Sequence, residues 1–228
     1  MPAITTPRML LLDAAFTADA LIAVGERGTI LRSTDQAATF QPIASPTPTT
    51  LTAVSFAPAS SLGWAVGHDA LILATTDAGK TWSRQYQGEN IQDSFLDVLA
   101  LDAQRVLAVG AYGLCVVTID AGKTWARRKL SDDDYHLNRL SRGPTGTLYL
   151  AGEHGTLLRS TDAGATWSKI PTPYEGSFYG ILPLTERAIL AYGLRGHAYR
   201  SIDDGATWTQ IPTPSPVLLA TAAQLGPD

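Results

Sequence analysis

The sequence predicts an all-β protein, a β-propeller built from four-stranded antiparallel blades. An eight-residue pattern, Ser/Thr-x-Asp-x-Gly-x-Thr-Trp, occurs five times at intervals of 41 to 43 residues. Before each copy lies a second recurring element, such as AVGERGTILR from Ala23, and before that an apolar alternating stretch, such as LTAVSFA from Leu51. Four short strands within a steady period of about forty residues are typical of propeller blades rather than of helical repeats.

Each octet is predicted to form the turn between the third and fourth strands of its blade. The Asp side chain is expected to accept hydrogen bonds from backbone amides about two residues on, and the Gly to adopt a positive φ. The Trp begins the outgoing strand and is expected in the core between neighbouring sheets. The structural residues of the octets are Asp35; Asp77, Gly79 and Trp82; Asp120, Gly122 and Trp125; Asp162, Gly164 and Trp167; and Asp203, Gly205 and Trp208.

The first octet departs from the pattern. It has Ala37 where the other copies have Gly, and Phe40 where they have Trp. Its turn therefore either holds Ala37 at a positive φ or changes type. We expect the first blade to be the least regular of the five.

The repeats divide one predicted domain, residues 1–228, into five complete blades, at about 9–44, 51–87, 94–130, 137–171 and 178–212. Residues 217–224 resemble only the first strand of a partial sixth blade and are expected to form an extra strand. Two arrangements stay open: a closed five-bladed ring in which this strand covers an edge, or an incomplete ring completed by further blades or by an oligomer.

The octets are similar to Asp-box motifs, also called bacterial neuraminidase repeats. AVG-x-x-G-x-x-L followed by S-T-D-x-G-x-T-W, as in AVGERGTIL from Ala23 and STDAGATW from Ser160, resembles the photosystem II stability and assembly factor family of β-propellers. The resemblance covers about Leu10 to Pro212 and implies a non-catalytic scaffold that binds a protein segment or helps to assemble a membrane complex. Members of that family usually have more blades. Sialidases, glycanases and sorting receptors share the motif, so it specifies the fold more narrowly than the activity.

The composition narrows the classes of partner. The net charge is −4 and no basic run occurs, so we predict no nucleic-acid partner. Cys115, the only cysteine, lies in an apolar strand and is interpreted as a buried structural thiol. The acidic run Asp132–Asp134 is interpreted as a solvated loop rather than a calcium site. No metal site and no cofactor are predicted.

The N-terminal stretch MPAITTPRMLLLDAAF lacks the features of a signal peptide, and no run approaches the roughly 18 apolar residues that span a bilayer. The sequence therefore predicts no transmembrane segment. The expected location is cytoplasmic as written, or periplasmic or exported if a signal was trimmed, and the native compartment stays open.

The turns between the second and third strands vary from blade to blade. Glycines form the scaffold of tight turns, but we expect the residues between them to be free of backbone constraints and available for binding. The candidate binding residues on this side are Glu26, Arg27, His68, Asp69, Tyr112, Glu153, His154 and Arg195.

We predict from this surface a non-enzymatic scaffold that binds a protein or peptide partner, with Arg27, Arg195, Tyr112 and His154 as anchors. A sialidase-like glycoside hydrolase is the first alternative, because the turns supply Arg, Tyr and Glu side chains. Loops of four residues are too short for a deep substrate cleft, which disfavours catalysis. A glycan-binding lectin is the second alternative, and it is disfavoured because equivalent turn positions carry different side chains.

Overall fold

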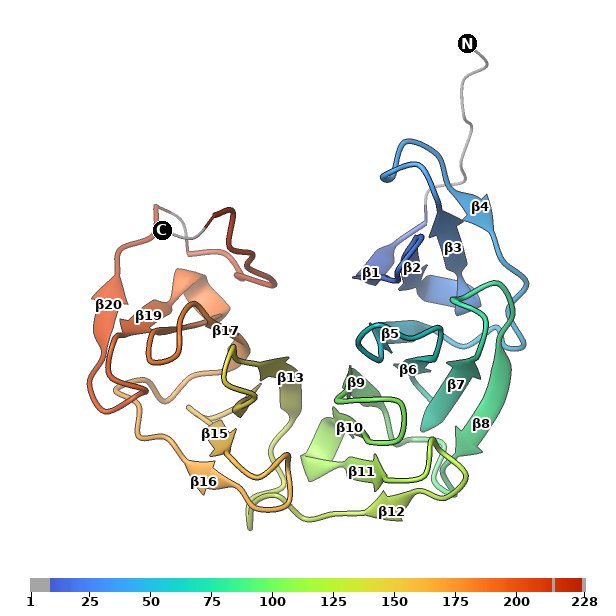
Figure 1. Ribbon diagram of the computed structural model, residues 1–228. Coiled ribbons are helices and arrows are strands. Elements are labelled where there is room, and N and C mark those ends of the chain that lie inside the picture. Colours follow the sequence, from blue (N-terminus) through green and yellow to red (C-terminus); the bar gives the residue numbers. More distant parts are fainter. Residues whose placement is uncertain (1–8, 215, 227–228) are drawn as a thin grey trace. The chain divides into compact units, whose positions relative to one another are not determined.

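The structure is a computed structural model that describes residues 9–214 and 216–226, and these residues form five separate four-stranded sheets (Figure 1). They divide into two compact units. Unit 1 runs to Ala108 and includes Val117–Ala126; unit 2 comprises Val109–Val116 and the chain from Arg127 onward. The third sheet has residues in both units, and each of the other sheets lies within one unit.

Each sheet is a blade whose four strands are antiparallel and follow chain order. Blade 1 comprises β1 (Leu11–Phe16), β2 (Leu21–Gly25), β3 (Ile30–Ser33) and β4 (Gln41–Pro42). Blade 2 comprises β5 (Leu51–Phe56), β6 (Gly63–Gly67), β7 (Leu71–Thr75) and β8 (Ser83–Gln87). Blade 3 comprises β9 (Phe95–Ala100), β10 (Val106–Gly110), β11 (Cys115–Thr118) and β12 (Ala126–Arg127).

Blade 4 comprises β13 (Leu137–Arg142), β14 (Leu148–Gly152), β15 (Leu157–Ser160) and β16 (Ser168–Lys169). Blade 5 comprises β17 (Phe178–Pro183), β18 (Ile189–Gly193), β19 (Ala198–Ser201) and β20 (Thr209–Ile211). Every sheet lies inside the range expected for its blade, and the predicted all-β fold of five four-stranded blades is confirmed.

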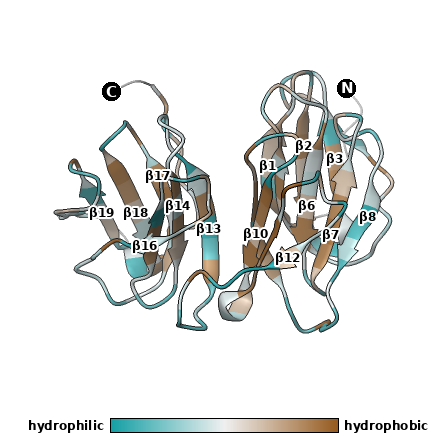
Figure 2. Cartoon of the chain, turned by 60° about the horizontal axis from the view of Figure 1, so that its bottom comes forward, coloured by the Kyte–Doolittle hydropathy of each residue, from teal (hydrophilic) through white to brown (hydrophobic). Residues whose placement is uncertain are grey.

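The second strand of each blade carries most of the core. All residues of β6, β10 and β14 are buried, and Figure 2 shows β10 and β18 as largely hydrophobic. The second strand packs on the next blade: Ile22 and Val24 share a cluster with Leu51 and Leu73 in unit 1. Burial of apolar side chains between sheets stabilises the blade pairs.

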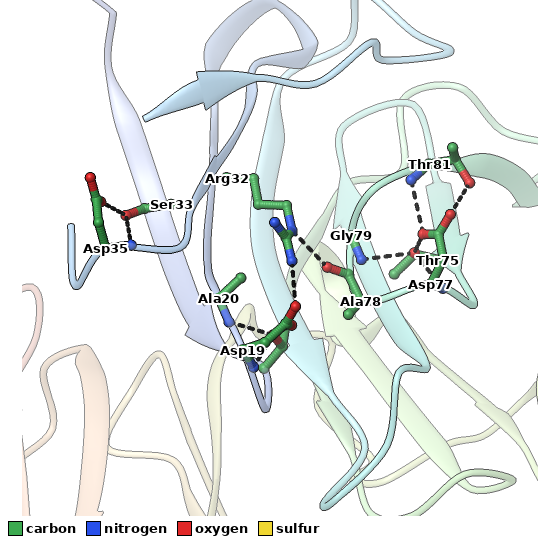
Figure 3. Close-up of polar contacts among 11 residues, drawn as sticks. Asp19, Ala20, Arg32, Ser33, Asp35, Thr75, Asp77, Ala78, Gly79 and Thr81 are labelled. Carbon is green, nitrogen blue, oxygen red and sulfur yellow. Dashed lines mark hydrogen bonds and ion pairs between the residues drawn. The ribbon is translucent and has the colours of Figure 1, made fainter. Parts of the chain in front are cut away.

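A closed set of side-chain hydrogen bonds holds each Asp-box turn. In blade 2 the Thr75 hydroxyl donates to Asp77 Oδ1 (2.8 Å) and accepts from the Gly79 amide (3.0 Å). Asp77 Oδ1 also accepts from the Thr81 amide (2.9 Å), and its Oδ2 from the Thr81 hydroxyl (2.6 Å), as Figure 3 shows. The expectation that the Asp side chain accepts from amides about two residues on is therefore wrong, because the carboxylate binds the residue four positions on. The same bonds form at Asp35, Asp120, Asp162 and Asp203.

These hydrogen bonds lower the pKa of all five carboxyl groups from 3.8 to about 2. The hydroxyl of the Thr four positions on is the largest cause at Asp35, Asp120, Asp162 and Asp203. At Asp77 burial is the largest single influence and raises the pKa, but the hydrogen bonds from Thr81, Thr75 and Lys80 together lower it. The charged form of each Asp is thus the form that holds the turn.

Two consecutive residues in each Asp-box turn are left-handed, whereas the sequence pointed only to the glycine. Ala78 has φ 59° and Gly79 has φ 79°. In the first copy, Ala37 adopts φ 67° and the turn keeps its type, with the Ala37 amide donating to the Ser33 hydroxyl (3.0 Å). The expectation that blade 1 is the least regular is wrong, since its turn has the same hydrogen bonds and its fourth strand is as long as those of blades 3 and 4.

The Asp-box tryptophans are less buried than the sequence suggested. Trp82 is in the core, with 8% of its surface exposed, whereas Trp125, Trp167 and Trp208 are only half-buried. They precede the short fourth strand at the sheet edge, so one side of the ring stays open. Trp82 Nε1 donates to the carbonyl of Gly79 (3.3 Å), which ties the ring to its own turn.

The expected extra strand at residues 217–224 is absent from the described part of the chain, in which β20 is the last strand. The segment is mostly exposed, and the Leu219 amide donates to the Gly193 carbonyl (3.0 Å) without a ladder of further bonds. Isolated pairing of this kind does not define a strand. Residues 1–8, which include half of the N-terminal stretch considered for a signal peptide, lie outside the described residues.

Candidate functional site

Each blade has two ends that are built differently. At one end, here called the Asp-box end, the Asp-box turn contacts the turn between the first and second strands, as when the Ala78 amide donates to the Ser61 carbonyl (2.9 Å). At the other end, called the linker end, the turn between the second and third strands contacts the linkers between blades. The Ala70 amide, for example, donates to the Asp93 carbonyl (2.7 Å). All eight candidate binding residues therefore lie at linker ends.

The linker-end turns share one backbone conformation. In every blade a non-glycine residue at the corner is left-handed, with φ between 50° and 57°. The expectation that backbone geometry does not constrain these positions is therefore wrong, because a left-handed non-glycine residue costs of order 1 kcal/mol. All five side chains are exposed at the corner. They are Arg27, Asp69, Tyr112, His154 and Arg195.

Two of the candidate carboxylates bind the backbone of their own blade. Glu26 Oε1 accepts from the Leu10 amide (3.2 Å). Glu153 Oε2 accepts from the His136 amide (3.1 Å), and its Oε1 lies 3.4 Å from His136 Nδ1. Both glutamates thus fasten the incoming chain just before the first strand. Sequence reasoning assigned them to binding and missed this local role.

The linker ends in unit 1 are lined by hydroxyl and carboxylate groups. The Thr49 hydroxyl donates to Asp69 Oδ2 (2.9 Å), and the Thr49 amide donates to the Thr47 hydroxyl (3.0 Å). His68 and Arg27 are exposed beside these turns. Thr47 and Thr49, which were not among the predicted binding residues, thus add hydroxyl groups to the linker ends of unit 1.

The linker ends in unit 2 carry three tyrosine–histidine pairs. Tyr112 meets His136 edge to face, with ring centres 4.8 Å apart, and Tyr135 stacks on His154 at 4.4 Å. The third pair lies further along: Tyr174 stacks on His197 at 4.5 Å. Each pair joins a linker residue to a turn residue. Only Tyr112 and His154 were among the predicted binding residues.

The third pair lies in a groove of about 570 Å³ in unit 2. Its walls are the turn and linker segments of blades 4 and 5. Arg195 supplies a guanidinium, Glu175 a carboxylate, and His154 and His197 two imidazoles. Burial raises the pKa of the Tyr174 hydroxyl, which is close to the Leu194 carbonyl (3.4 Å). Arg195 also borders a neighbouring groove of about 340 Å³ that is walled by prolines.

The thiol and the acidic run that the sequence analysis singled out have the following surroundings. The Cys115 thiol is buried, and burial raises its pKa to about 12, so it stays protonated. In the acidic run, Asp132 pairs with Lys129 (3.1 Å). Among residues 9–214 and 216–226, no three His, Cys, Asp or Glu side chains are grouped so that they could hold a metal ion.

The described residues contain no helix of the length and hydropathy needed to cross a membrane. The helical turns at the linker ends are each three residues long: η1 (Glu26–Gly28), η2 (Ala111–Gly113) and η3 (Leu194–Gly196).

Several solved structures are similar to this chain. A structure described as YCF48 bound to D1 peptide matches with a TM-score of 0.52 and 20% identity over 89% of this chain and 82% of that one. YCF48 from Cyanidioschyzon merolae matches with a TM-score of 0.60 and 20% identity over 92% and 87%. A GH74 enzyme of Niastella koreensis reaches a TM-score of 0.72 at 18% identity, over 88% of this chain but 38% of the enzyme. At these identities the likeness shows the fold.

A search of proteins with curated functions finds no match to this sequence. The model of one family, described as photosynthesis system II assembly factor YCF48, matches residues 3–91 and 85–215. These two stretches overlap and together span most of the sequence, so the chain belongs to the photosynthesis system II assembly factor YCF48 family.

Proposed function

We propose that this protein is a non-catalytic assembly factor that binds a peptide segment of a partner protein at the linker ends of its blades, with the groove around Arg195 as the principal contact. The groove is the observation that carries the proposal. It combines a guanidinium, a carboxylate, two imidazoles and the Tyr174 ring in one concave surface. Grooves with a few placed polar groups among aromatic side chains are typical of binding sites.

The family and one of its structural relatives support a peptide as the partner. The relative is described as YCF48 bound to D1 peptide. In this chain, a peptide lying in the groove would meet donors from Arg195 and an aromatic surface from the Tyr174–His197 pair. Arg and Tyr side chains commonly contribute most of the binding free energy at interfaces.

The contacts of the carboxylates support a non-catalytic role. Glycoside hydrolysis needs two carboxyl groups on either side of the scissile bond. Among the described residues that line the groove, Glu175 is the one carboxylate, and nearby Glu153 binds the His136 amide and lies 3.4 Å from its ring. The likeness to GH74 enzymes concerns the fold and brings no catalytic pair to this groove.

The proposal is tested with a fluorescently labelled D1 peptide whose binding is followed by anisotropy. Arg195→Glu should weaken binding at least about tenfold, because it reverses a charge in the groove. Arg187→Glu is the matched control, since Arg187 is an exposed residue at the Asp-box end of the same blade. It should leave the affinity within about twofold. Equal binding by wild type and Arg195→Glu would contradict the proposal, as would equal losses in both variants.

Arg27→Glu tests whether unit 1 takes part. If the bound peptide extends over unit 1, this variant also weakens binding, whereas a peptide confined to the groove leaves it unchanged. In both variants the melting temperature should stay nearly that of the wild type, because both arginines are exposed.

A further inference from the structure

His197 forms part of the aromatic wall of the groove. Its imidazole stacks on the Tyr174 ring, with ring centres 4.5 Å apart and 26° between the planes. The Tyr199 ring of β19 lies nearly parallel to the imidazole, with 6° between the planes at 6.1 Å. His197 is half-buried and borders both grooves of unit 2, as Arg195 does. Packing therefore fixes an imidazole beside the space that a bound peptide occupies.

The hydrogen bonds of the His197 imidazole are typical of its neutral form. Nδ1 lies 3.3 Å from the Tyr199 hydroxyl oxygen and 3.4 Å from Nε2 of Gln210 on β20. An amide nitrogen only donates, so Nδ1 accepts and the proton of the neutral ring is on Nε2. No residue in the described part of the chain bonds to that Nε2. The imidazole therefore has an N–H available to a ligand.

The surroundings of His197 also accommodate its charged form. When Nδ1 gains a proton it becomes a donor, and the Tyr199 hydroxyl oxygen can accept from it. The Gln210 amide can turn over and present its oxygen in place of its nitrogen. Stacking on Tyr174 favours the charged ring, because the face of an aromatic ring attracts a cation. Both charge states of His197 therefore have hydrogen-bond partners, as a side chain that changes charge with pH requires.

The other ionisable groups around His197 come from several elements. They are Tyr199 of β19, Arg195 of η3, Tyr174 and Glu175 of the linker before β17, and His154 of the turn in blade 4. Burial raises the pKa of both tyrosine hydroxyls above the usual value of 10, so both stay neutral. Carboxylate and guanidinium groups ordinarily keep their charges between about pH 5 and 8, whereas imidazoles change theirs. The groove therefore changes its charge over this range through its two histidines.

Acidification makes the lining of the groove positive. Arg195 and Glu175 carry opposite charges, so the groove is close to neutral while its imidazoles are uncharged. Each imidazole that gains a proton adds a positive charge. His154 is exposed and stacks on Tyr135 of another linker at 4.4 Å, whereas His197 is half-buried. Because solvent and salt screen a partly buried charge less, His197 contributes the more effective of the two charges.

We propose that the groove binds an Asp or Glu side chain of the peptide with both Arg195 and His197, and that protonation of His197 strengthens this contact. The inference rests on the proposed function and adds the chemistry of the ligand and its pH response. A hydrogen bond between charged groups is roughly twice as strong as one between neutral groups. The affinity for an acidic segment should therefore rise as the pH falls from about 8 to about 5.5.

Selection from a random library of displayed peptides tests the chemistry of the ligand. Peptides are captured on the full chain at about pH 5.5 and released at about pH 8. The released peptides should be enriched in Asp and Glu at least about threefold over the library. Captured peptides that show no such enrichment, or that stay bound at about pH 8, would overturn this inference and leave the proposed function standing. Capture of no peptide at either pH would contradict both.

Variants of His197 test the pH response with a labelled peptide from that selection. The wild type should bind it at least about tenfold more tightly at about pH 5.5 than at about pH 8. His197→Gln, which cannot become charged, should reduce this ratio to below about threefold. His197→Lys, which is charged throughout, should raise the affinity at about pH 8 toward the wild-type value at about pH 5.5. Arg187→Gln is the matched control, since it removes a positive charge at the Asp-box end of the same blade, and it should leave the ratio unchanged.

The opposite effects of the two His197 variants separate the inference from a folding defect, because a damaged groove does not bind more tightly. A peptide in which Asn and Gln replace each Asp and Glu should lose the pH dependence with the wild type. Equal wild-type affinities at the two pH values, or an unchanged ratio in His197→Gln or with the amide peptide, would refute the inference. A loss in His154→Gln as large as that in His197→Gln would refute the assignment of the response to His197.

Discussion

The two ends of a blade reverse the chain with the same backbone conformation, but the side chains of the two turns make different contacts. At the Asp-box end and at the linker end, two consecutive left-handed residues reverse the chain, for example Ala78 and Gly79 at one and Tyr112 and Gly113 at the other. At the Asp-box end the side chains of the turn bind its own amides in all five copies. At the linker end the corner side chain is exposed and varies among the blades: it is arginine in blades 1 and 5 and aspartate, tyrosine and histidine in blades 2, 3 and 4. The first end therefore stabilises the blade, whereas the second presents side chains that vary from blade to blade and that we propose for binding.

The linker ends also differ from one another. In unit 1 they are lined by hydroxyls around Thr49 and Asp69. In unit 2 three tyrosine–histidine pairs and a groove occupy the equivalent positions. The repeated scaffold thus separates the groups that hold its Asp-box turns from the groups that we propose to bind a partner, and the following variants test that separation.

Gly205→Ala should have the largest effect on stability. Gly205 has φ 88°, and a Cβ placed there would come within 2.3 Å of Ile170 Cγ2. Backbone strain and overpacking together should lower the free energy of unfolding by about 2–4 kcal/mol. Urea unfolding followed by tryptophan fluorescence measures it.

Ala37→Gly is the matched control, because Ala37 holds the same turn position with φ 67° but is exposed. This variant should change the free energy of unfolding by less than about 1 kcal/mol, in the stabilising direction. Equal and opposite changes at the two positions would mean that backbone strain alone, rather than contact with the preceding blade, requires the glycine.

The second largest effect is expected from acid, which should destabilise the Asp-box turns. Because their folded-state pKa values are about 2 and the unfolded value is 3.8, the unfolded chain binds more protons in this interval. The contribution of these carboxylates to the free energy of unfolding is fully present above about pH 4 and is lost as the pH drops toward 2. Asp77→Asn should be less stable at neutral pH and should lose less on acidification. Parallel curves for the two proteins would show that Asp77 does not contribute to the acid response.

Tyr112→Ala should have the smallest effect on folding. Tyr112 is 72% exposed and contacts the ring of His136. Its removal should change the free energy of unfolding by less than about 0.5 kcal/mol. A larger loss would mean that the tyrosine–histidine pairs hold the linkers, and the contrast between the two ends would be weaker than we infer.

The sequence predicted the blades and the Asp-box turns because each depends on residues within one period. It could not reveal that Glu26 and Glu153 bind the incoming chain, since a turn glutamate looks the same whether it binds solvent or the Leu10 or His136 amide. It overstated the burial of Trp125, because the pattern does not say how much of a strand edge the next blade covers. It also suggested a strand at 217–224, where the residues suit a strand but none of the strands in the described part of the chain pairs with them.

The period, the turn chemistry and the order of strands follow from the sequence by itself, since hydrogen bonds such as Thr81 to Asp77 join residues only four positions apart. The proposed binding surface, in contrast, depends on the tertiary structure. The partners in Tyr135–His154 and Tyr174–His197 come from different elements and meet only when a linker packs against a turn. Local bonds can be read along the chain, whereas contacts between elements depend on packing that no single repeat specifies.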